Sequence, residues 1–450
     1  MMKTLKHTLA IMAVLAIASC EKNPEVHDVV ADSWNPTDEE LFADDYFDKY
    51  VDPVSGVVSY WFKSELKEFP EKYNTQSTYY LTKSMTDDLR FCYFFVSTKE
   101  KDGRLPTQRS ARIFDFKERK LYTFPGTDGC YPYLDNKTDV LYYFEMNPAK
   151  SGVRDGGRFW KRDLLNAPKS PVQLASLPKA VAPTGCYVNR ALSHITLTQD
   201  KQWVFLDSWV NDRFIQGMLN IYTGEWDEWS RNNNEKHLTH GQINPKNDKE
   251  VFLAMDSWDD SQGVHHSIDS FYDKEKDAFP KIHIMSPDGS YRIIDPRDAS
   301  NNNNNYVTHC MWHYDGDHLY WCASGVNIRN VRTGKHEYPY QKRATHCNLT
   351  YDMKYITLDN DQLAGDGDFD GWRGGRWRVT FFNRETGKSV DLITESPAIT
   401  TKDKPSRIHP DPHPHFVCND KYIVCTMADK TGYLRWSITP VDQLIRLTSK

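Results

Sequence analysis

One strand–turn–strand pattern with a histidine at a fixed place recurs along this chain of 450 residues. In three copies Ser or Thr precedes the histidine and an Asp follows six residues after it at a polar turn; the histidines are His194, His309 and His346. A fourth copy around His240 has a longer turn, and a looser fifth copy spans residues 413–425. Alternating apolar and polar residues on both sides of such a turn are typical of a β-hairpin. The repeat therefore predicts an all-β chain built from similar hairpins.

A second kind of hairpin follows most of these copies and carries a glycine at its tip. Examples are residues 220–225, 330–335 and 382–388. Glycine supplies the positive φ that tight hairpin turns need. Two hairpins make four strands, and seven such units fill residues 75–448 without amphipathic helices between them. We therefore expect a seven-bladed β-propeller with four-stranded antiparallel blades.

The N-terminus is typical of an export signal. Lys3 and Lys6 precede an apolar stretch at 9–17 that is too short to cross a bilayer, and the small residues before Cys20 resemble a bacterial lipobox. We expect lipidation of Cys20, which would anchor the protein to a membrane without spanning it; ordinary cleavage near Ser19 is the alternative. Because no Asp follows Cys20, we expect an outer-membrane lipoprotein that faces the periplasm or the outside.

These features divide the chain into three segments. We expect a lipoprotein signal peptide at 1–19, an acidic tether and lead-in at 20–74, and the catalytic propeller domain at 75–450. The eight cysteines beyond Cys20 lack metal-finger spacing, so we expect them to be mostly buried strand residues. The net charge is −6 and no basic stripe is present, so nucleic acid is the least expected partner and we expect none to bind.

The propeller topology predicts where the repeat histidines lie. Each one begins the innermost strand of a blade, so the histidines should ring the central channel on one face. The long insertions at 256–280 and 361–376 belong to that same face, whereas the opposite face has only tight turns. Loops held by a rigid scaffold commonly carry function, so this mouth of the channel is the candidate site.

Two interpretations of the histidines remain open. Each could fix its blade by hydrogen bonds, which is the interpretation we prefer for His194 and His346. The segment 407–415 differs because alternating prolines hold the chain extended and separate Asp411 from the two histidines that follow it. Imidazole and carboxylate together suit Mn, Zn, Fe or Ni better than an all-oxygen calcium cage.

Three short stretches carry a resemblance to a known family. Residues 239–245 contain a His-x-Gln motif, residues 309–312 a His-x-x-Trp motif, and residues 407–416 an Arg followed by a His- and Pro-rich run. At these stretches the chain resembles the oligogalacturonate lyases, which are seven-bladed propeller polysaccharide lyases. The resemblance implies His240 as the proton-abstracting base and Arg407 as an assisting cation. It implies His309 and His413 as ligands of a divalent metal.

The chain also departs from the family pattern. Ile408 stands where the family has Gln, and Asp411 stands where it has another ligand histidine. These departures leave three alternatives. The site could bind a different metal, another residue of the segment could serve as a ligand, or the metal could have been lost. The candidate metal ligands are His309, His409, Asp411, His413 and His415. We expect Mn as the metal, with Zn, Ni or Ca as alternatives.

This assignment is chemically coherent for a substrate that contains uronic acid. Removing the proton next to the carboxylate creates a dianionic, enolate-like species, which a nearby cation stabilises by several kcal/mol. A histidine base with an ordinary pKa of about 6.5 is partly neutral at pH 7. Candidate substrate-binding residues are Gln242, the tryptophans Trp209 and Trp258, and the arginines Arg213 and Arg373.

The sequence therefore predicts a lyase that cleaves uronate-containing oligosaccharides or polysaccharides by metal-assisted β-elimination. Two alternatives stay open. A glycoside hydrolase on the same scaffold would ordinarily need a pair of carboxylates at the mouth, for which Asp256, Asp259, Asp260 and Asp411 are candidates. A non-catalytic glycan-binding lipoprotein would need only a structural ring of histidines.

Overall fold

The computed structural model describes residues 34–66, 73–98, 110–123, 132–165, 171–233, 237–259, 262–266, 281–294, 307–322, 325–360, 377–396 and 411–450. The expected signal peptide and Cys20 lie outside these residues. None of the helices among the described residues is long and apolar enough to cross a membrane.

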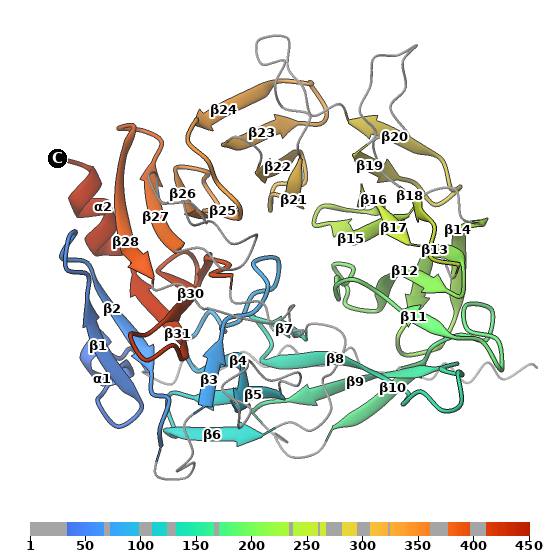
Figure 1. Ribbon diagram of the computed structural model, residues 1–450, viewed down its shortest axis with the longest axis horizontal. Coiled ribbons are helices and arrows are strands. Elements are labelled where there is room, and N and C mark those ends of the chain that lie inside the picture. The colour runs from blue at the N-terminus through green and yellow to red at the C-terminus, as the bar shows by residue number, and fades with distance from the viewer. Residues whose placement is uncertain are drawn as a thin grey trace, which may run out of the picture.

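The described residues form a ring of seven antiparallel sheets, so the predicted seven-bladed β-propeller is confirmed (Figure 1). Blade 1 consists of β3 (Tyr73–Gln76), β4 (Phe91–Thr98), β5 (Ser110–Asp115) and β6 (Lys120–Thr123). Blade 2 consists of β7 (Tyr133–Asp135), β8 (Val140–Met146), β9 (Gly157–Asp163) and β10 (Val172–Ser176). Blade 3 consists of β11 (Val188–Arg190), β12 (Trp203–Val210), β13 (Arg213–Asn220) and β14 (Trp226–Asn233).

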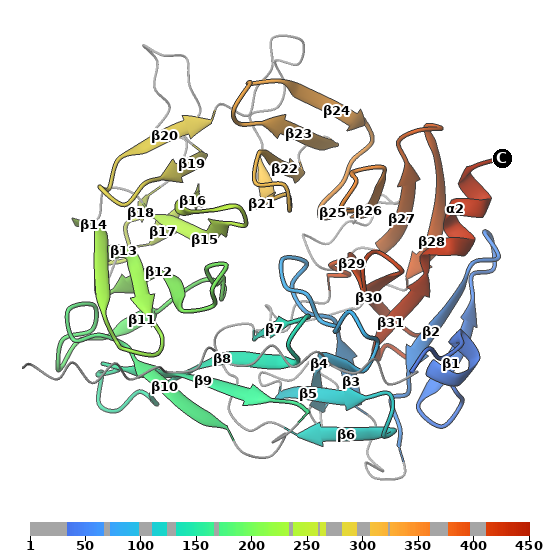
Figure 2. The same ribbon diagram turned by 180° about the vertical axis from the view of Figure 1, so that it is seen from behind.

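Blades 4 to 6 repeat the same four-strand order. They are β15 (Leu238–Asn244), β16 (Asn247–Met255), β19 (Ile282–Met285) and β20 (Tyr291–Ile294); β21 (Thr308–Trp312), β22 (His318–Cys322), β23 (Val326–Asn330) and β24 (His336–Tyr340); and β25 (Cys347–Leu349), β26 (Tyr355–Asn360), β27 (Trp377–Asn383) and β28 (Lys388–Ser396). In each blade the first strand is the innermost one, as Figure 2 shows from behind.

The seventh blade joins the two ends of the chain. It contains β29 (His415–Val417), β30 (Tyr422–Ala428) and β31 (Leu434–Pro440), and then the N-terminal strands β2 (Val58–Phe62) and β1 (Phe47–Val51). Tyr60 pairs with Ile438 in this sheet. The expected lead-in at 20–74 is therefore corrected: from Phe47 onward it belongs to the propeller, because its strands supply the outer part of blade 7 and close the ring.

Aromatic packing holds this closure together. Phe62 is fully buried and its ring lies 4.6 Å from that of Phe94 in blade 1 and 5.4 Å from that of Phe47. The C-terminal helix α2 (Val441–Thr448) covers the outside of blade 6, where Val441 and Leu444 pack with Leu392. The short helix α1 (Asp38–Leu41) precedes β1 and is capped by Thr37.

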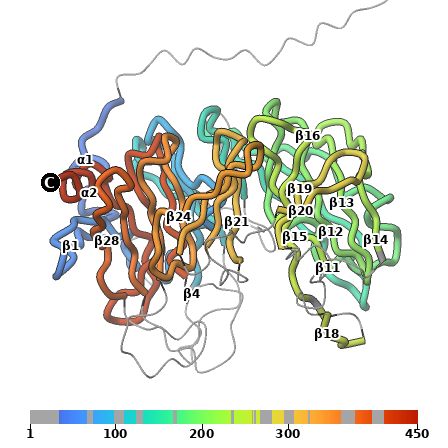
Figure 3. The backbone as a smooth tube through the Cα atoms, turned by 90° about the horizontal axis from the view of Figure 1, so that it is seen from above, coloured from blue at the N-terminus to red at the C-terminus, as the bar shows by residue number. Residues whose placement is uncertain are grey.

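The two faces of the disc differ in their connections. An extra hairpin, β17 (Trp258–Asp259) with β18 (His265–His266), is inserted between the second and third strands of blade 4 and stands off one face (Figure 3). The pairing of Leu238 with Met255 places the start of β15 at this same face. Below, it is called the hairpin face.

The cysteines take no part in cross-links within the described residues. Seven of them are buried and free: Cys92, Cys186, Cys310, Cys322, Cys347, Cys418 and Cys425. Five of the seven lie in strands, which agrees with the sequence expectation, whereas Cys186 and Cys418 lie in turns.

Candidate active site at the hairpin face of the channel

Three histidines at the inner ends of the blades have a left-handed backbone. The φ values are 58° at His240, 55° at His309 and 48° at His413. The pairing register shifts at the first two, between Thr239 and Gln242 in β15 and across His309 in β21, so each lies on a β-bulge. A non-glycine residue with positive φ is strained, and bulges redirect a side chain out of the regular alternation. The same left-handed backbone thus recurs at three histidines, from blades 4, 5 and 7.

Two buried carboxylates hold these backbones across blade boundaries. Asp207 on β12 accepts hydrogen bonds from the Ser193 amide at 2.6 Å and from the Gly241 amide at 3.1 Å. The Ser193 hydroxyl in turn accepts the His240 amide at 3.0 Å. A side chain at Gly241 would meet the ring of Phe205 at 2.6 Å, so this position needs glycine. Asp207 therefore fixes the bulge that presents His240.

Asp359 on β26 makes comparable contacts three blade boundaries further on. It accepts the His346 amide at 2.8 Å and the His413 amide at 3.1 Å. It also lies 2.9 Å from Nδ1 of the His346 ring, and both side chains are almost fully buried. A carboxylate on one imidazole nitrogen fixes the ring and leaves the other nitrogen, Nε2, to bind elsewhere, as it does behind many metal ligands.

A candidate metal centre lies where blades 6 and 7 meet. His346, Asp411 and His413 are buried, and one ligand atom from each lies within 4.8 Å of the others. The His309 ring lies 3.9 Å from the His346 ring, and its Nδ1 lies 2.6 Å from the carbonyl of Thr345, so Nε2 is the nitrogen that can bind a further group. Two imidazoles beside a buried carboxylate fit Mn, Zn, Fe or Ni, and the His309 ring lies next to this group.

Burial keeps one of these rings in the metal-binding form. Desolvation, and secondly the neighbouring His346 ring, lower the pKa of His309 well below its usual value. A histidine must be neutral to bind a metal through Nε2. His309 is therefore ready to bind a cation without first losing a proton at neutral pH.

Two tyrosines from blade 1 occupy the channel between the histidines. Tyr79 stacks on the His194 ring at 4.9 Å and meets the His413 ring edge-on at 4.9 Å. Tyr80 lies 5.4 Å from the His346 ring and is 2% exposed. Tyr79 thus stands between the metal group on one side and His194 and its neighbour His240 on the other.

His240 is the exposed member of the histidine ring. Its side chain is 38% exposed, and its Nδ1 lies 3.3 Å from the Asp256 carboxylate, which also pairs with Lys281. Burial alone would raise the pKa of Asp256, but the hydrogen bonds from His240 and Lys281 outweigh it, so that the pKa falls far below its usual value. Asp256 is therefore a permanent anion behind an accessible imidazole, an arrangement that suits a general base.

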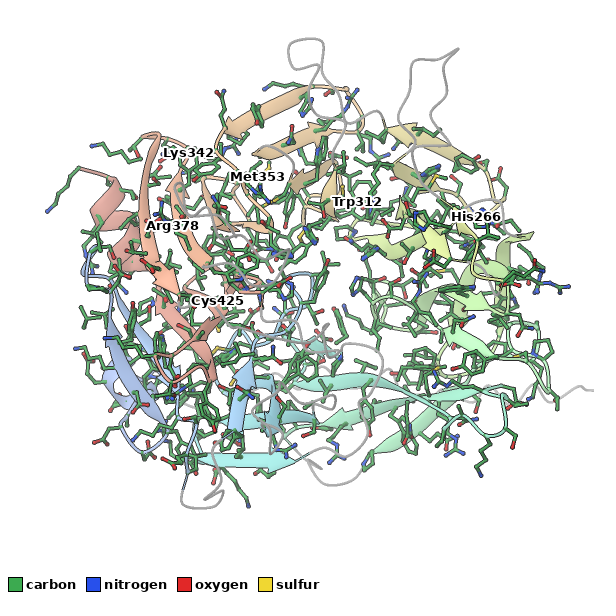
Figure 4. All side chains as sticks on the ribbon, viewed as in Figure 1. His266, Trp312, Lys342, Met353, Arg378 and Cys425 are labelled. Atoms are coloured by element: carbon green, nitrogen blue, oxygen red, sulfur yellow. The ribbon has the colours of Figure 1, made fainter. Side chains whose placement is uncertain are left out.

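Gln242 bridges blades 4 and 5 instead of facing the mouth. Its amide donates to the Cys310 carbonyl at 3.0 Å, and its oxygen accepts the Trp312 amide at 3.3 Å. Figure 4 shows Trp312 at the inner part of the fifth blade. These bonds use both ends of the side chain within the protein and hold β21, on which His309 lies.

The other sequence candidates are distributed as follows. His415 is buried, with Nε2 3.0 Å from the Ser84 hydroxyl and Nδ1 3.0 Å from the His413 carbonyl, so both nitrogens are used within the protein. Trp209 is half-buried on β12, and Arg213 is exposed at the start of β13. Arg373, Arg407, His409 and the side chain of Trp258 lie outside the described residues.

His346 and Asp359 are what sequence reasoning missed. We expected His346 to fix its blade, whereas the structure places it in the metal group. A signal was available: Asp207 and Asp359 both follow a leucine in the second strand of their blades, fourteen residues after Ser193 and after Thr345. That shared position predicts a common contact at the inner end of each blade.

Comparisons with known proteins give the fold a context. No protein-family model matches the chain, and no curated protein matches its sequence. Among solved structures, an oligogalacturonate lyase in complex with manganese superposes with a TM-score of 0.64 at 16% identity, covering 90% of this chain and 97% of that one. An oligogalacturonate lyase from Vibrio parahaemolyticus superposes with a TM-score of 0.62, also at 16% identity, covering 88% and 96%. At this identity the likeness shows a shared fold over almost the whole length.

Proposed function

We propose that this protein is a lyase that cleaves oligosaccharides of uronic acid by β-elimination, with His240 as the base and a divalent cation on the other side of Tyr79. One observation carries the proposal: an accessible imidazole backed by a carboxylate shares one channel mouth with a buried group of two imidazoles and a carboxylate. Elimination next to a carboxylate needs these two elements, a base and a concentrated positive charge.

The fit of the donor set supports a metal at this place. His346, Asp411 and His413 supply three buried ligand atoms, with His309 next to them. A bound divalent cation would supply the charge that stabilises the anion formed when the proton next to the substrate carboxylate is removed. We propose manganese, because it accepts both imidazole and carboxylate and because the similar oligogalacturonate lyase was solved with it.

His240 would take that proton through Nε2. Its Nδ1 faces Asp256, which favours the neutral tautomer with the hydrogen on Nδ1. When the ring becomes positive, the anionic Asp256 stabilises it, and Lys281 keeps Asp256 ionised and in place. Tyr79, stacked on His194, limits how far a sugar enters the channel, so the reacting unit stays near the mouth.

The hydrolase alternative fits the described part of the site less well. A glycosidase needs two carboxylates that flank the scissile bond. Asp256 is held by Lys281 and His240, and Asp411 is 2% exposed beside His413. Neither carboxylate is placed to act alone on a glycosidic oxygen, so these positions favour elimination.

The experiment is an ultraviolet assay on galacturonate oligomers. Elimination creates a double bond conjugated to the carboxylate, and this product absorbs ultraviolet light. Hydrolysis and simple binding create no such double bond. We expect absorbance to rise with the manganese-loaded protein and to be lost after chelation. Production of reducing ends without absorbance would establish hydrolysis and reject the lyase.

The substrate and the location are part of the proposal. We propose a uronate-containing oligosaccharide as partner and a membrane anchor through lipidated Cys20, which would hold the enzyme at the outer membrane. Metabolic labelling with a radioactive fatty acid tests the anchor: wild type should be labelled and Cys20→Ala should not.

A further inference from the structure

An arginine that sequence analysis did not single out lies behind the proposed base. Arg190 ends β11, the innermost strand of blade 3, and is paired in register with Trp209. Its terminal nitrogen lies 3.0 Å from Nε2 of His237, just ahead of β15. His237 accepts the Asp256 amide through its carbonyl at 3.1 Å. Arg190 is thus linked through one residue to the Asp256–His240 pair.

Arg190 has no carboxylate within ion-pair distance among the residues that the structure describes. Its Nε is buried and has no hydrogen-bond partner there. Asp256, whose amide bonds to the His237 carbonyl, is engaged by Lys281 and His240. A partly buried guanidinium without an anion is costly unless a ligand supplies one, and its planar donors match a carboxylate in bidentate fashion.

The neighbouring His237 orients Arg190. His237 is buried, and burial together with the positive charge of Arg190 lowers the pKa of His237 to about 3. It is therefore neutral at physiological pH and holds the guanidinium as an acceptor without adding charge. The Trp209 ring lies 5.5 Å from the His237 ring, and Trp209 is the cross-strand partner of Arg190. An aromatic face next to a carboxylate-binding cation suits a uronic acid ring.

The position of Arg190 distinguishes which sugar it would bind. The metal group belongs to blades 6 and 7, whereas Arg190 and His237 belong to blades 3 and 4, across the channel (Figure 1). Tyr79 and His194 stand between the metal group and His240. The carboxylate of the reacting sugar must lie toward the metal, so a carboxylate at Arg190 belongs to another unit of the same chain.

We infer that Arg190, with Trp209 beside it, is a subsite that binds the carboxylate of a uronate unit next to the one that reacts. The inference rests on the proposed function for the place of the reacting sugar. It makes the protein selective for runs of consecutive uronic acids over isolated ones.

The test is direct binding by calorimetry with two probes, trigalacturonic acid and monomeric galacturonic acid, using the manganese-loaded protein. Arg190→Gln should weaken binding of the trimer by about 10- to 100-fold, the usual loss for a charged hydrogen-bonded contact, and binding of the monomer by less than about threefold. Arg231→Gln, on the outermost strand of the same blade, is the matched control and should leave both affinities unchanged.

Arg190→Lys covers the case in which the glutamine variant fails to fold. It keeps the charge but not the planar fork, so it should retain part of the trimer affinity. Unchanged trimer binding in both variants would overturn the inference. Equal losses for trimer and monomer would also overturn it, because Arg190 would then hold the reacting unit.

Failure of the proposed function gives a different result. If wild type binds the trimer in a manner that depends on Arg190 but forms no unsaturated product, the lyase is wrong and the subsite stands. If the unsaturated product forms and trimer binding does not depend on Arg190, the subsite is wrong and the lyase stands. If wild type binds neither probe, the subsite is rejected.

Discussion

At the scale of single residues, Asp207 and Asp359 make comparable backbone contacts: Asp207 holds the residue next to His240, and Asp359 holds His346 and His413. Each accepts one amide from its own blade and one from the next blade. Only Asp359 also contacts an imidazole of the metal group. The two carboxylates therefore separate the positioning of the base from the orientation of a metal ligand.

This difference predicts that an aspartate-to-asparagine substitution has different effects at the two positions. Asp359→Asn should weaken manganese binding by about 10- to 100-fold, because the carboxylate that orients His346 is lost. Asp207→Asn is the matched control and should leave manganese affinity unchanged while lowering turnover through His240. Calorimetric titration with manganese measures the first effect, and equal affinities in the two variants would contradict it.

His240 is the second prediction at this scale. His240→Ala should lower turnover of galacturonate oligomers by about 100- to 10,000-fold, the usual contribution of a general base, with the fold intact. His318→Gln, a histidine in the second strand of blade 5 at the opposite face, is the control and should stay near wild type. Near-normal turnover by the alanine variant would remove His240 from the mechanism.

Sequence reasoning was uneven for the site residues. It singled out His240, His309, Asp411 and His413 from their motifs, and the structure brings the last three into contact distance of one another or of His346. It assigned His346 to blade packing, although His346 shares its spacing to the turn Asp with both His194 and His309. Spacing fixes the strand on which a histidine lies, whereas its neighbour across the blade boundary depends on the fold.

At the scale of elements, the strand pairs of the repeat were predictable and the closure of the ring was not. Hairpins are encoded within a dozen residues by alternation and turn glycines. The strand β2 pairs with residues almost four hundred positions away, as Tyr60 does with Ile438, and β1 joins the sheet only through β2. Nothing in the local sequence of 47–62 indicates that pairing partner, so the sequence alone predicts a polar lead-in there.

The closure predicts a strong stability effect at one buried position. Phe62→Ala should lower the free energy of unfolding by about 3–5 kcal/mol, because the phenyl ring is fully buried between blades 7 and 1 and its loss leaves a cavity. Val54→Ala, 76% exposed between β1 and β2, is the control and should change it by less than about 0.5 kcal/mol. Urea unfolding followed by tryptophan fluorescence measures both; equal midpoints would show that β2 contributes little to closure.

At the scale of the whole molecule, the ring arrangement explains how distant histidines meet. His194, His240, His309, His346 and His413 come from five successive blades, and each lies at the inner, hairpin-face end of its blade. Once seven four-stranded blades are predicted, this convergence follows from topology alone. The contacts that decide chemistry, such as Asp359 with His346, depend on side-chain packing between blades.

The same burial makes the whole molecule sensitive to acid. His237 is 7% exposed, and burial followed by the charge of Arg190 lowers its pKa to about 3, while an unfolded chain has a histidine pKa of about 6.5. Between these values the unfolded state binds a proton that the native state does not, so the free energy of unfolding falls as pH falls. From pH 6.5 to pH 5 this residue alone accounts for about 2 kcal/mol.

Burial also lowers the pKa of His194 well below its usual value, so its contribution has the same sign and adds to the slope. Urea unfolding at pH 5, 6, 7 and 8 should therefore show stability nearly constant above pH 7 and decreasing below about pH 6.5. His237→Gln keeps an acceptor for Arg190 but cannot titrate, so its average slope between pH 5 and 6.5 should be shallower by about 1.1 kcal/mol per pH unit. Parallel slopes in the variant and wild type would mean that His237 is protonated in the native state, which its buried contact with a guanidinium opposes.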